Sequence, residues 1–240
     1  MPNPWDAIDA VYVISNPQHE PGRFERVVKQ LKRHHTPVAK IKIAGPTWGS
    51  TLSTETCFQV YDPFLPRPFP CFVFKSRALS RGEISLVLNF YSAMKDAKER
   101  NFNHIMILES DVIFHHEFEE RLSTILGQLQ DKEWDYVSLS DGVGTHTGEF
   151  EPNKPAYGLW WSRPQTLKIA PTVLCFRCTD SMLLNKDFIH YLSENLLPFR
   201  DCLDWELNYR LYAKQGKAFW AEPHIIEQGS LKGIDKSSLV

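Results

Sequence analysis

Two acidic side chains at the end of an apolar run form the pattern with the clearest chemistry in this 240-residue chain. Glu109 and Asp111 follow residues 104–108, whose lack of polar alternation is typical of a strand covered on both faces. Alternate side chains of an extended chain point the same way, so we expect both carboxylates beyond the strand's carboxyl end, where open α/β sheets bind ligands. A divalent cation such as Mn²⁺ or Mg²⁺ would relieve their repulsion. The alternative is a polar strand end with a helix cap.

Two later features, a pair of acids at a helix start and a histidine after a strand, indicate a functional site only when they are considered with that acid pair. Asp204 and Glu206 open a predicted helix at 204–215, where acids commonly interact with the positive end of the helix dipole. His224 follows a predicted strand at 217–221, and a lone histidine in such a place is usually structural. The acid pair, the acid at the helix start and the late histidine therefore become persuasive as a functional site only as a set.

The surrounding pattern predicts one α/β domain, with a mixed, mostly parallel central sheet flanked by helices. Ser80 and Glu83 have the spacing of a capping box, which marks a helix start. Prolines and glycines make 45–77 and 140–170 irregular stretches. Periodicity predicts strands at 10–14, 40–44, 104–108, 136–139, 172–177 and 217–221, and helices at 23–35, 80–100, 118–129, 180–195 and 204–215, the last ending at Gly216 as a C-cap glycine.

Composition restricts the partners. The 27 lysines and arginines against 29 aspartates and glutamates give a net charge of −2, whereas a general nucleic-acid binder would more often be clearly basic. No apolar run reaches the length of a membrane span, and residues 1–10 do not resemble a secretory signal. Five irregularly spaced cysteines, with one isolated C-x-x-C at Cys175 and Cys178, favour buried thiols in the reducing cytoplasm.

The motifs also resemble a known family. Gly82-Glu83-Ile84, the run Ile107-Leu-Glu-Ser-Asp-Val112 and the later Asp204 are similar to glycosyltransferase family 25, the lipopolysaccharide and procollagen galactosyltransferase type. The similarity follows the same order from about 11 to 229. It implies a GT-A fold, with a nucleotide-binding part at about 10–140 and an acceptor and catalytic part at about 141–230. Two departures are Ser110, where the family has a middle acid, and Asn89-Phe90, where it has Ser-His.

The resemblance implies a metal-dependent, inverting transfer of sugar from a nucleotide diphosphate, with UDP as the expected nucleotide, to a hydroxyl of a glycan or glycoconjugate. Asp111 and His224 would hold Mn²⁺ or Mg²⁺, and Glu109 would lie near the ribose or bind the metal through water. Asp204, favoured over Glu206 by the correspondence, would take the proton from the acceptor.

Further site residues follow from the same resemblance. The first strand and its loop would contact the nucleotide, and arginines would contact the diphosphate, although a solvated charge is an equally good interpretation of each arginine. Aromatic side chains would suit an acceptor sugar or, equally, form a small core under a loop. The expected donor contacts are Val13, Ile14, Ser15, Asn16, Arg23 or Arg26, Arg81, Glu109 and Ser110, and the expected acceptor contacts are Tyr157, Trp160 and Trp161.

Two other functions remain open. A nucleotidyltransferase also places acids and metal at strand ends, but residues 15–22 contain one glycine and no lysine, which disfavours a phosphate-binding loop there. A non-catalytic carbohydrate-binding protein that has kept the fold would account for the departures at Ser110 and Phe90.

Overall fold

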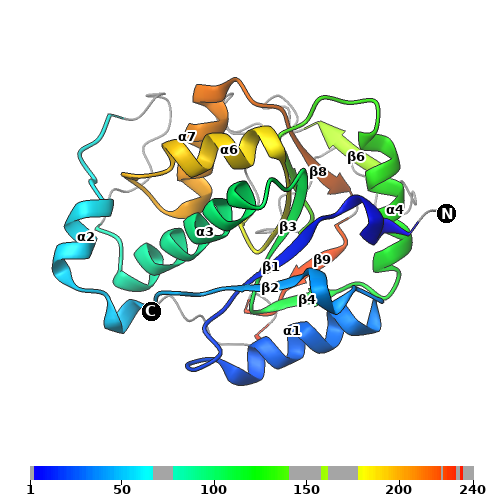
Figure 1. Cartoon of the computed structure of the whole chain (residues 1–240), viewed down its shortest axis with the longest axis horizontal. Helices are drawn as coiled ribbons and strands as arrows, with labels where there is room; N and C mark the ends of the chain where they lie inside the picture. The colour runs from blue at the N-terminus through cyan, green and yellow to red at the C-terminus, as the bar shows by residue number, and fades with distance from the viewer. Residues whose placement is uncertain are drawn as a thin grey trace.

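The computed structural model describes residues 3–66, 78–140, 158–161, 178–222, 224–230 and 233–234. Its centre is a seven-stranded sheet in the order β2-β1-β3-β7-β5-β8-β6, beside a two-stranded sheet of β4 and β9 (Figure 1). The large sheet contains β2 (Ile41–Ala44), β1 (Ala10–Ile14), β3 (His104–Glu109), β7 (Ser181–Asn185), β5 (Tyr136–Ser138), β8 (Ala218–Glu222) and β6 (Gly158–Trp161). The small sheet contains β4 (Val112–Phe114) and β9 (Ile226–Gln228).

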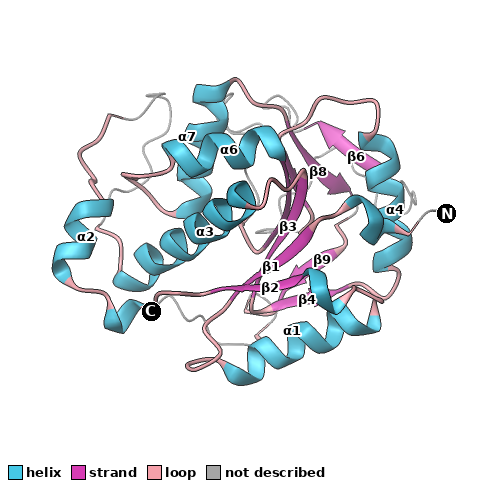
Figure 2. Cartoon of the chain, viewed as in Figure 1, coloured by secondary structure: helices cyan, strands magenta, loops and turns pink. Residues whose placement is uncertain are grey.

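The sheet is mixed, as the sequence predicts (Figure 2). Strand β1 is parallel to both β2 and β3, and β5 is parallel to β8. Strand β7 is antiparallel to β3 and to β5, and β6 is antiparallel to β8. Five strands, β2, β1, β3, β5 and β8, therefore run in one direction, so the expectation of a mostly parallel sheet is confirmed.

The described part of the chain contains six α-helices: α1 (Pro21–Arg33), α2 (Thr54–Val60), α3 (Arg81–Glu99), α4 (Phe118–Leu129), α6 (Lys186–Asn195) and α7 (Leu203–Lys214). Three short 3₁₀ turns are also present: η1 (Pro4–Ala7) before β1, η2 (Val38–Lys40) before β2 and η3 (Gly49–Thr51) before α2. Among the described helices, none is both long and apolar enough to cross a membrane.

Alternation along the central strands separates two cores. Ile105 and Ile107 of β3 pack with α3, α6 and α7, whereas Met106 and Leu108 pack with α1 and α4. Both faces of β3 are thus covered, as its unbroken apolar run predicts. Glu109 continues the register of Ile105 and Ile107, so it is directed to the face that α7 covers.

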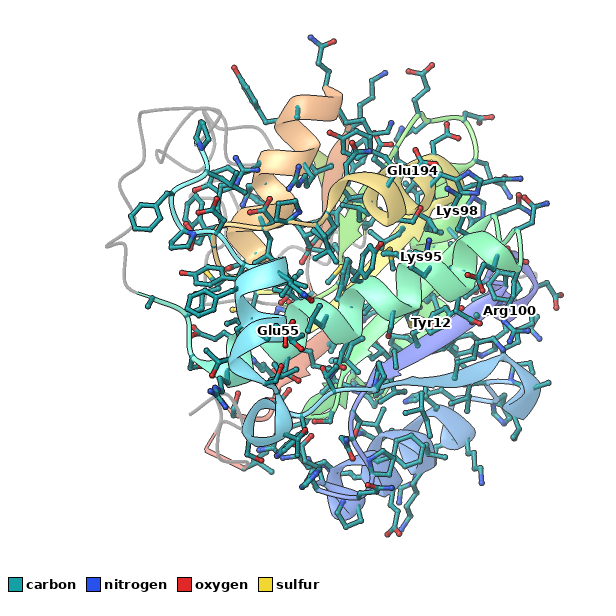
Figure 3. All side chains as sticks on the ribbon, turned by 60° about the vertical axis from the view of Figure 1, so that its left-hand side comes forward. Tyr12, Glu55, Lys95, Lys98, Arg100 and Glu194 are labelled. Carbon is teal, nitrogen blue, oxygen red and sulfur yellow. The ribbon has the colours of Figure 1, made fainter. Side chains whose placement is uncertain are left out.

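Helix α3 is fixed at both ends. The predicted capping box is present, since the Ser80 hydroxyl accepts from the Glu83 amide at 3.2 Å and the Ser80 amide donates to the Glu83 carboxylate at 2.8 Å. Near the other end, Lys98 forms an ion pair with Glu194 of α6, and the two side chains point toward one another in Figure 3. The helix start therefore has a defined position beside the ends of β1 and β3.

Three expectations need correction. Residues 180–195 are not one helix, because 181–185 form β7 between β3 and β5, and Asn185 then caps α6 by accepting from the Phe188 amide at 2.9 Å. Parts of both expected irregular stretches are regular, since η3 and α2 lie within 45–77 and β6 lies within 140–170. The left-handed residue that ends α7 is Gln215, with φ of 56°, rather than Gly216. The predicted strand at 172–177 lies outside the described residues.

Candidate active site

A cleft of about 340 Å³ opens beyond the carboxyl ends of β1 and β3, where an open α/β sheet is expected to bind its ligand. The two strands end at the same level, since Ile14 pairs with Glu109. The cleft is lined by eight of the residues expected to contact donor or metal: Ile14, Ser15, Asn16, Arg23, Arg81, Glu109, Ser110 and Asp111. The structure therefore brings together residues that are up to 97 positions apart (111 − 14) in the chain.

Close backbone packing shapes one wall of this cleft. A Cβ atom on Gly45, just after β2, would lie 1.8 Å from the main-chain oxygen of Ser15. A Cβ atom on Gly49 would lie 2.7 Å from the amide nitrogen of Gly82 at the start of α3. Real side chains do not tolerate such distances, so glycine is required for these segments to come together.

The main electrostatic feature of the site is a cluster of carboxylates around Glu109. Burial, together with the nearby charges of Asp111 and Asp180, raises the pKa of Glu109 to about 8, and Asp204 adds to this effect. The Thr179 hydroxyl donates to Glu109 at 3.0 Å and partly opposes the rise. The end of β3, the start of β7 and the start of α7 thus bring acids close enough to one another to favour the protonated form of Glu109. Among the described residues, only His115, His116 and Glu117 lie close enough together for three side chains to share one metal ion.

Asp111 has the features of a metal ligand. Its side chain is buried, and one carboxylate oxygen, Oδ2, accepts from the Ser230 amide at 3.2 Å. The other oxygen, Oδ1, is buried without a hydrogen-bond partner among the described residues. Burying a carboxylate oxygen without a hydrogen-bond partner costs folding free energy. A divalent cation that prefers oxygen ligands would offset this cost by binding that oxygen. Asp111 therefore fits the hard cation expected from the sequence.

The turn between β3 and β4 explains how Asp111 reaches the cleft. Ser110 and Asp111 form a turn and do not continue the strand, so simple alternation along an extended chain is not the reason that both acids converge. The main-chain oxygen of Asp111 instead accepts from the Gly229 amide at 2.7 Å. A segment near the end of the chain therefore holds the acid motif in place, and Gln228 and Ser230 of that segment line the cleft.

His224 does not accompany the acids, contrary to expectation. In the ladder of β4 and β9, Val112 pairs with Gln228, so continuation of the register places His224 opposite His116. At about 3.3 Å per residue, the five residues from His224 to Gly229 span roughly 16 Å. The His224 ring instead lies 3.5 Å from the Glu227 carboxylate. It is also close enough to His115 to contribute, after burial, to the lowered pKa of that residue.

Asp204 and Glu206 have different surroundings, although both lie in the first turn of α7. Asp204 is close enough to Glu109 to affect its pKa, and burial raises the pKa of Asp204 itself. Glu206 is fully buried and forms ion pairs with Arg210 at 2.7 Å and Arg200 at 3.2 Å. Asp204 is therefore the acid that joins the carboxylate cluster, and Glu206 is held in a separate buried ion-pair network instead of a catalytic position.

The remaining expected contacts divide into two groups. Val13 is fully buried in the core with α1, so its side chain does not reach the cleft, and Arg26 is not among the residues that line it. Tyr157 lies outside the described residues, as do the side chains of Trp160 and Trp161, for which only the strand β6 is described.

The sequence interpretation missed three parts of the site. Asp180 was assigned to a helix, although a short apolar run such as 182–184, just after an acid, also fits a strand that begins there. Glu20 precedes α1, and Trp48 stacks on His19 with ring centroids 4.6 Å apart. Both Glu20 and Trp48 line the cleft, but no local spacing signals this, because their loops are brought together only by the sheet.

The described residues form an α/β domain with a mixed sheet, a cleft at its strand ends and a cluster of interacting carboxylates. A family model described as "Glycosyltransferase family 25 (LPS biosynthesis protein)" matches residues 69–153, which include α3, β3 and the acid motif. The resemblance to glycosyltransferase family 25 is thereby confirmed for this part of the chain. Asp204 and His224 lie outside the matched range.

Similar curated proteins carry related names. The chain is 26% identical to human procollagen galactosyltransferase 2 over 137 residues, which cover 56% of this chain and 20% of that protein. It is 28% identical over 138 residues to procollagen galactosyltransferase 1-B of Xenopus laevis, covering 55% and 21%, and 30% identical over 137 residues to procollagen galactosyltransferase 2 of Mus musculus, covering 56% and 20%. The match spans about one fifth of the length of these relatives.

Proposed function

We propose that this chain is a metal-dependent, inverting glycosyltransferase that transfers a sugar from a UDP-linked donor to a hydroxyl group of a glycan or glycoconjugate. The observation that supports this proposal best is the carboxylate cluster at the cleft, in which Asp111 presents a buried oxygen without a partner among the described residues. The similarity to family 25 adds the reaction class.

The cleft offers suitable groups for the donor. Arg23 and Arg81 line it together with the N-terminal turn of α3, and both guanidinium groups and helix N-termini bind phosphate. Asn16 adds a polar amide at the end of β1. Asp111 and Glu109 would hold Mn²⁺ or Mg²⁺ beside the diphosphate. The bound ion would offset the negative charge that develops on the departing UDP.

Asp204 is the proposed general base. Its raised pKa increases its affinity for a proton, as a base that works near neutral pH requires. In the proposed step, the acceptor oxygen forms a bond to the anomeric carbon as the bond from that carbon to the diphosphate oxygen breaks. Asp204 receives the proton of the acceptor hydroxyl, and UDP leaves with the electron pair. One displacement of this kind inverts the anomeric centre.

Two substitutions separate binding from transfer. Asp111→Ala should abolish Mn²⁺-dependent UDP binding, measured by calorimetry, because it removes the oxygens that face the cleft. Asp204→Asn should leave UDP binding within about twofold of the parent and remove sugar transfer, since the amide cannot accept the proton. Asp131→Asn, an exposed change of the same type, is the matched control and should alter neither.

The assay is UDP release from a panel of UDP sugars with Mn²⁺, with and without simple glycan acceptors, and the anomeric configuration of the product is read by NMR. Transfer by Asp204→Asn at the parental rate would refute the assignment of the base. UDP binding without turnover of any donor would favour the non-catalytic, carbohydrate-binding alternative.

A further inference from the structure

Ser110, Glu20 and Arg23 form a connected chain of polar contacts in the cleft. The Ser110 hydroxyl donates to one carboxylate oxygen of Glu20 at 3.2 Å, and the Arg23 guanidinium contacts the other at 3.0 Å. The side chains of Glu20 and Arg23 are only 10% and 16% exposed. Glu20 is itself anchored, since its amide donates to the Asn16 carbonyl at 2.8 Å.

This contact accounts for a serine at position 110, because the side chain at that position faces the carboxylate of Glu20. An aspartate there would put two carboxylates at hydrogen-bonding distance, next to the cluster that already raises the pKa of Glu109. A serine hydroxyl donates to Glu20 instead of repelling it.

We propose that Glu20 is a positioning residue: it is anchored by Ser110 and holds the Arg23 guanidinium toward the diphosphate of the donor. This inference rests on the proposed function. Glu20 precedes α1 and lies 90 residues before Ser110, so the contact joins two separate loops of the cleft.

The charge balance of the contact supports this role. Glu20 alone would add a negative charge to the cleft that Asp111 also lines, whereas the Glu20–Arg23 pair is neutral as a unit. A guanidinium group has five N–H donors in a planar fork, so Arg23 can contact Glu20 and a phosphate oxygen together. Arg81, by contrast, is directed to the Leu52 carbonyl and the Thr54 hydroxyl, both at 2.8 Å.

The test is a double-mutant cycle of Ser110→Asp and Glu20→Gln. Affinity for UDP in the presence of Mn²⁺ is measured by calorimetry, and the midpoint of thermal unfolding is measured without ligand. Ser110→Asp should weaken UDP binding at least tenfold. Glu20→Gln should weaken it about fivefold, because Arg23 loses its ion pair. The double variant should bind UDP at least fivefold more tightly than Ser110→Asp alone, because the side-chain amide introduced at position 20 can donate to the carboxylate introduced at position 110.

Two further variants keep the result interpretable. Ser110→Ala removes the anchor without adding charge and should weaken UDP binding about threefold with an unfolding midpoint within about 2 °C of the parent. Glu25→Gln, an exposed change on α1, is the matched control and should leave both measurements unchanged.

The outcomes separate the two proposals. Suppose that the parent binds UDP. The positioning role of Glu20 is then refuted if the losses of the two single variants multiply in the double variant, or if Ser110→Asp and Ser110→Ala bind UDP as the parent does. The proposed function stands in either case. A parent protein that binds no UDP with Mn²⁺ refutes the proposed function, and the positioning role with it.

Discussion

Raising the pH should destabilise the metal-free protein through Glu109. A free glutamate has a pKa of 4.5, whereas the carboxylate cluster raises the pKa of Glu109 to about 8 in the folded state. Below pH 4.5 both states carry the proton, so Glu109 has no effect. Between these two values the unfolded chain is ionised and the folded protein keeps its proton, so stability falls as pH rises. Above pH 8 both states are ionised, and the full loss is present.

The size of this effect follows from the two pKa values. A difference of about 3.5 units, at about 1.4 kcal/mol each, sets an upper limit of about 5 kcal/mol. For a chain of this length, each kcal/mol changes the unfolding temperature by about 2–4 °C, so one third of the limit gives a shift of about 3–6 °C. Such a shift is readily measured.

The assay compares thermal unfolding of the EDTA-treated parent and Glu109→Gln from pH 5 to pH 9. The glutamine can still accept from the Thr179 hydroxyl but has no charge, so its unfolding temperature should fall less steeply. Adding Mn²⁺ at pH 8.5 should restore more stability to the parent than to the variant, because the cation offsets the carboxylate charges. Parallel pH profiles for parent and variant would contradict the assigned electrostatics, and Glu25→Gln should follow the parent.

Two other predictions concern the elements that support the cleft. Gly45→Ala should weaken UDP binding at least tenfold and lower the unfolding temperature, because the new Cβ would lie 1.8 Å from the Ser15 oxygen. Gly127→Ala in α4, where a Cβ meets nothing within 4 Å, should be neutral or stabilising by about 0.5–1 kcal/mol, and equal effects would contradict the steric reason. Glu206→Gln should cost about 3–5 kcal/mol in urea unfolding, because Arg200 and Arg210 lose a buried carboxylate, and a loss under about 1 kcal/mol would contradict this.

The sequence predicted the cleft well where local patterns determine position. The apolar runs of β1 and β3 identify central strands, and parallel central strands end at the same edge of a sheet, so residues just beyond both runs had to meet. The capping box at Ser80 fixed the start of α3, which placed Arg81 at that edge. These patterns depend on residues close together in the chain, so tertiary contacts do not change the elements that they predict.

The parts that the sequence could not predict depend on tertiary register. His224 and Ser230 both follow β8, and only the pairing of β4 with β9 determines that Ser230 reaches Asp111 while His224 lies opposite His116. Asp180 was misassigned because a short apolar run fits a buried strand or a helix equally well, and β7 is decided by its pairing with β3 and β5.

The two acids of the motif are oriented by different parts of the chain. Asp111 lies in the turn after β3, where the amides of Gly229 and Ser230 hold its main-chain oxygen and Oδ2, so its position depends on a segment more than 110 residues later. Glu109 still belongs to β3 and is directed to the face covered by α7, where Asp204 affects its pKa. The turn after β3 therefore gives the two acids different surroundings. In the proposed function Asp111 would bind the cation, and Glu109, whose pKa is raised by both Asp111 and Asp204, lies electrostatically between that acid and the proposed base.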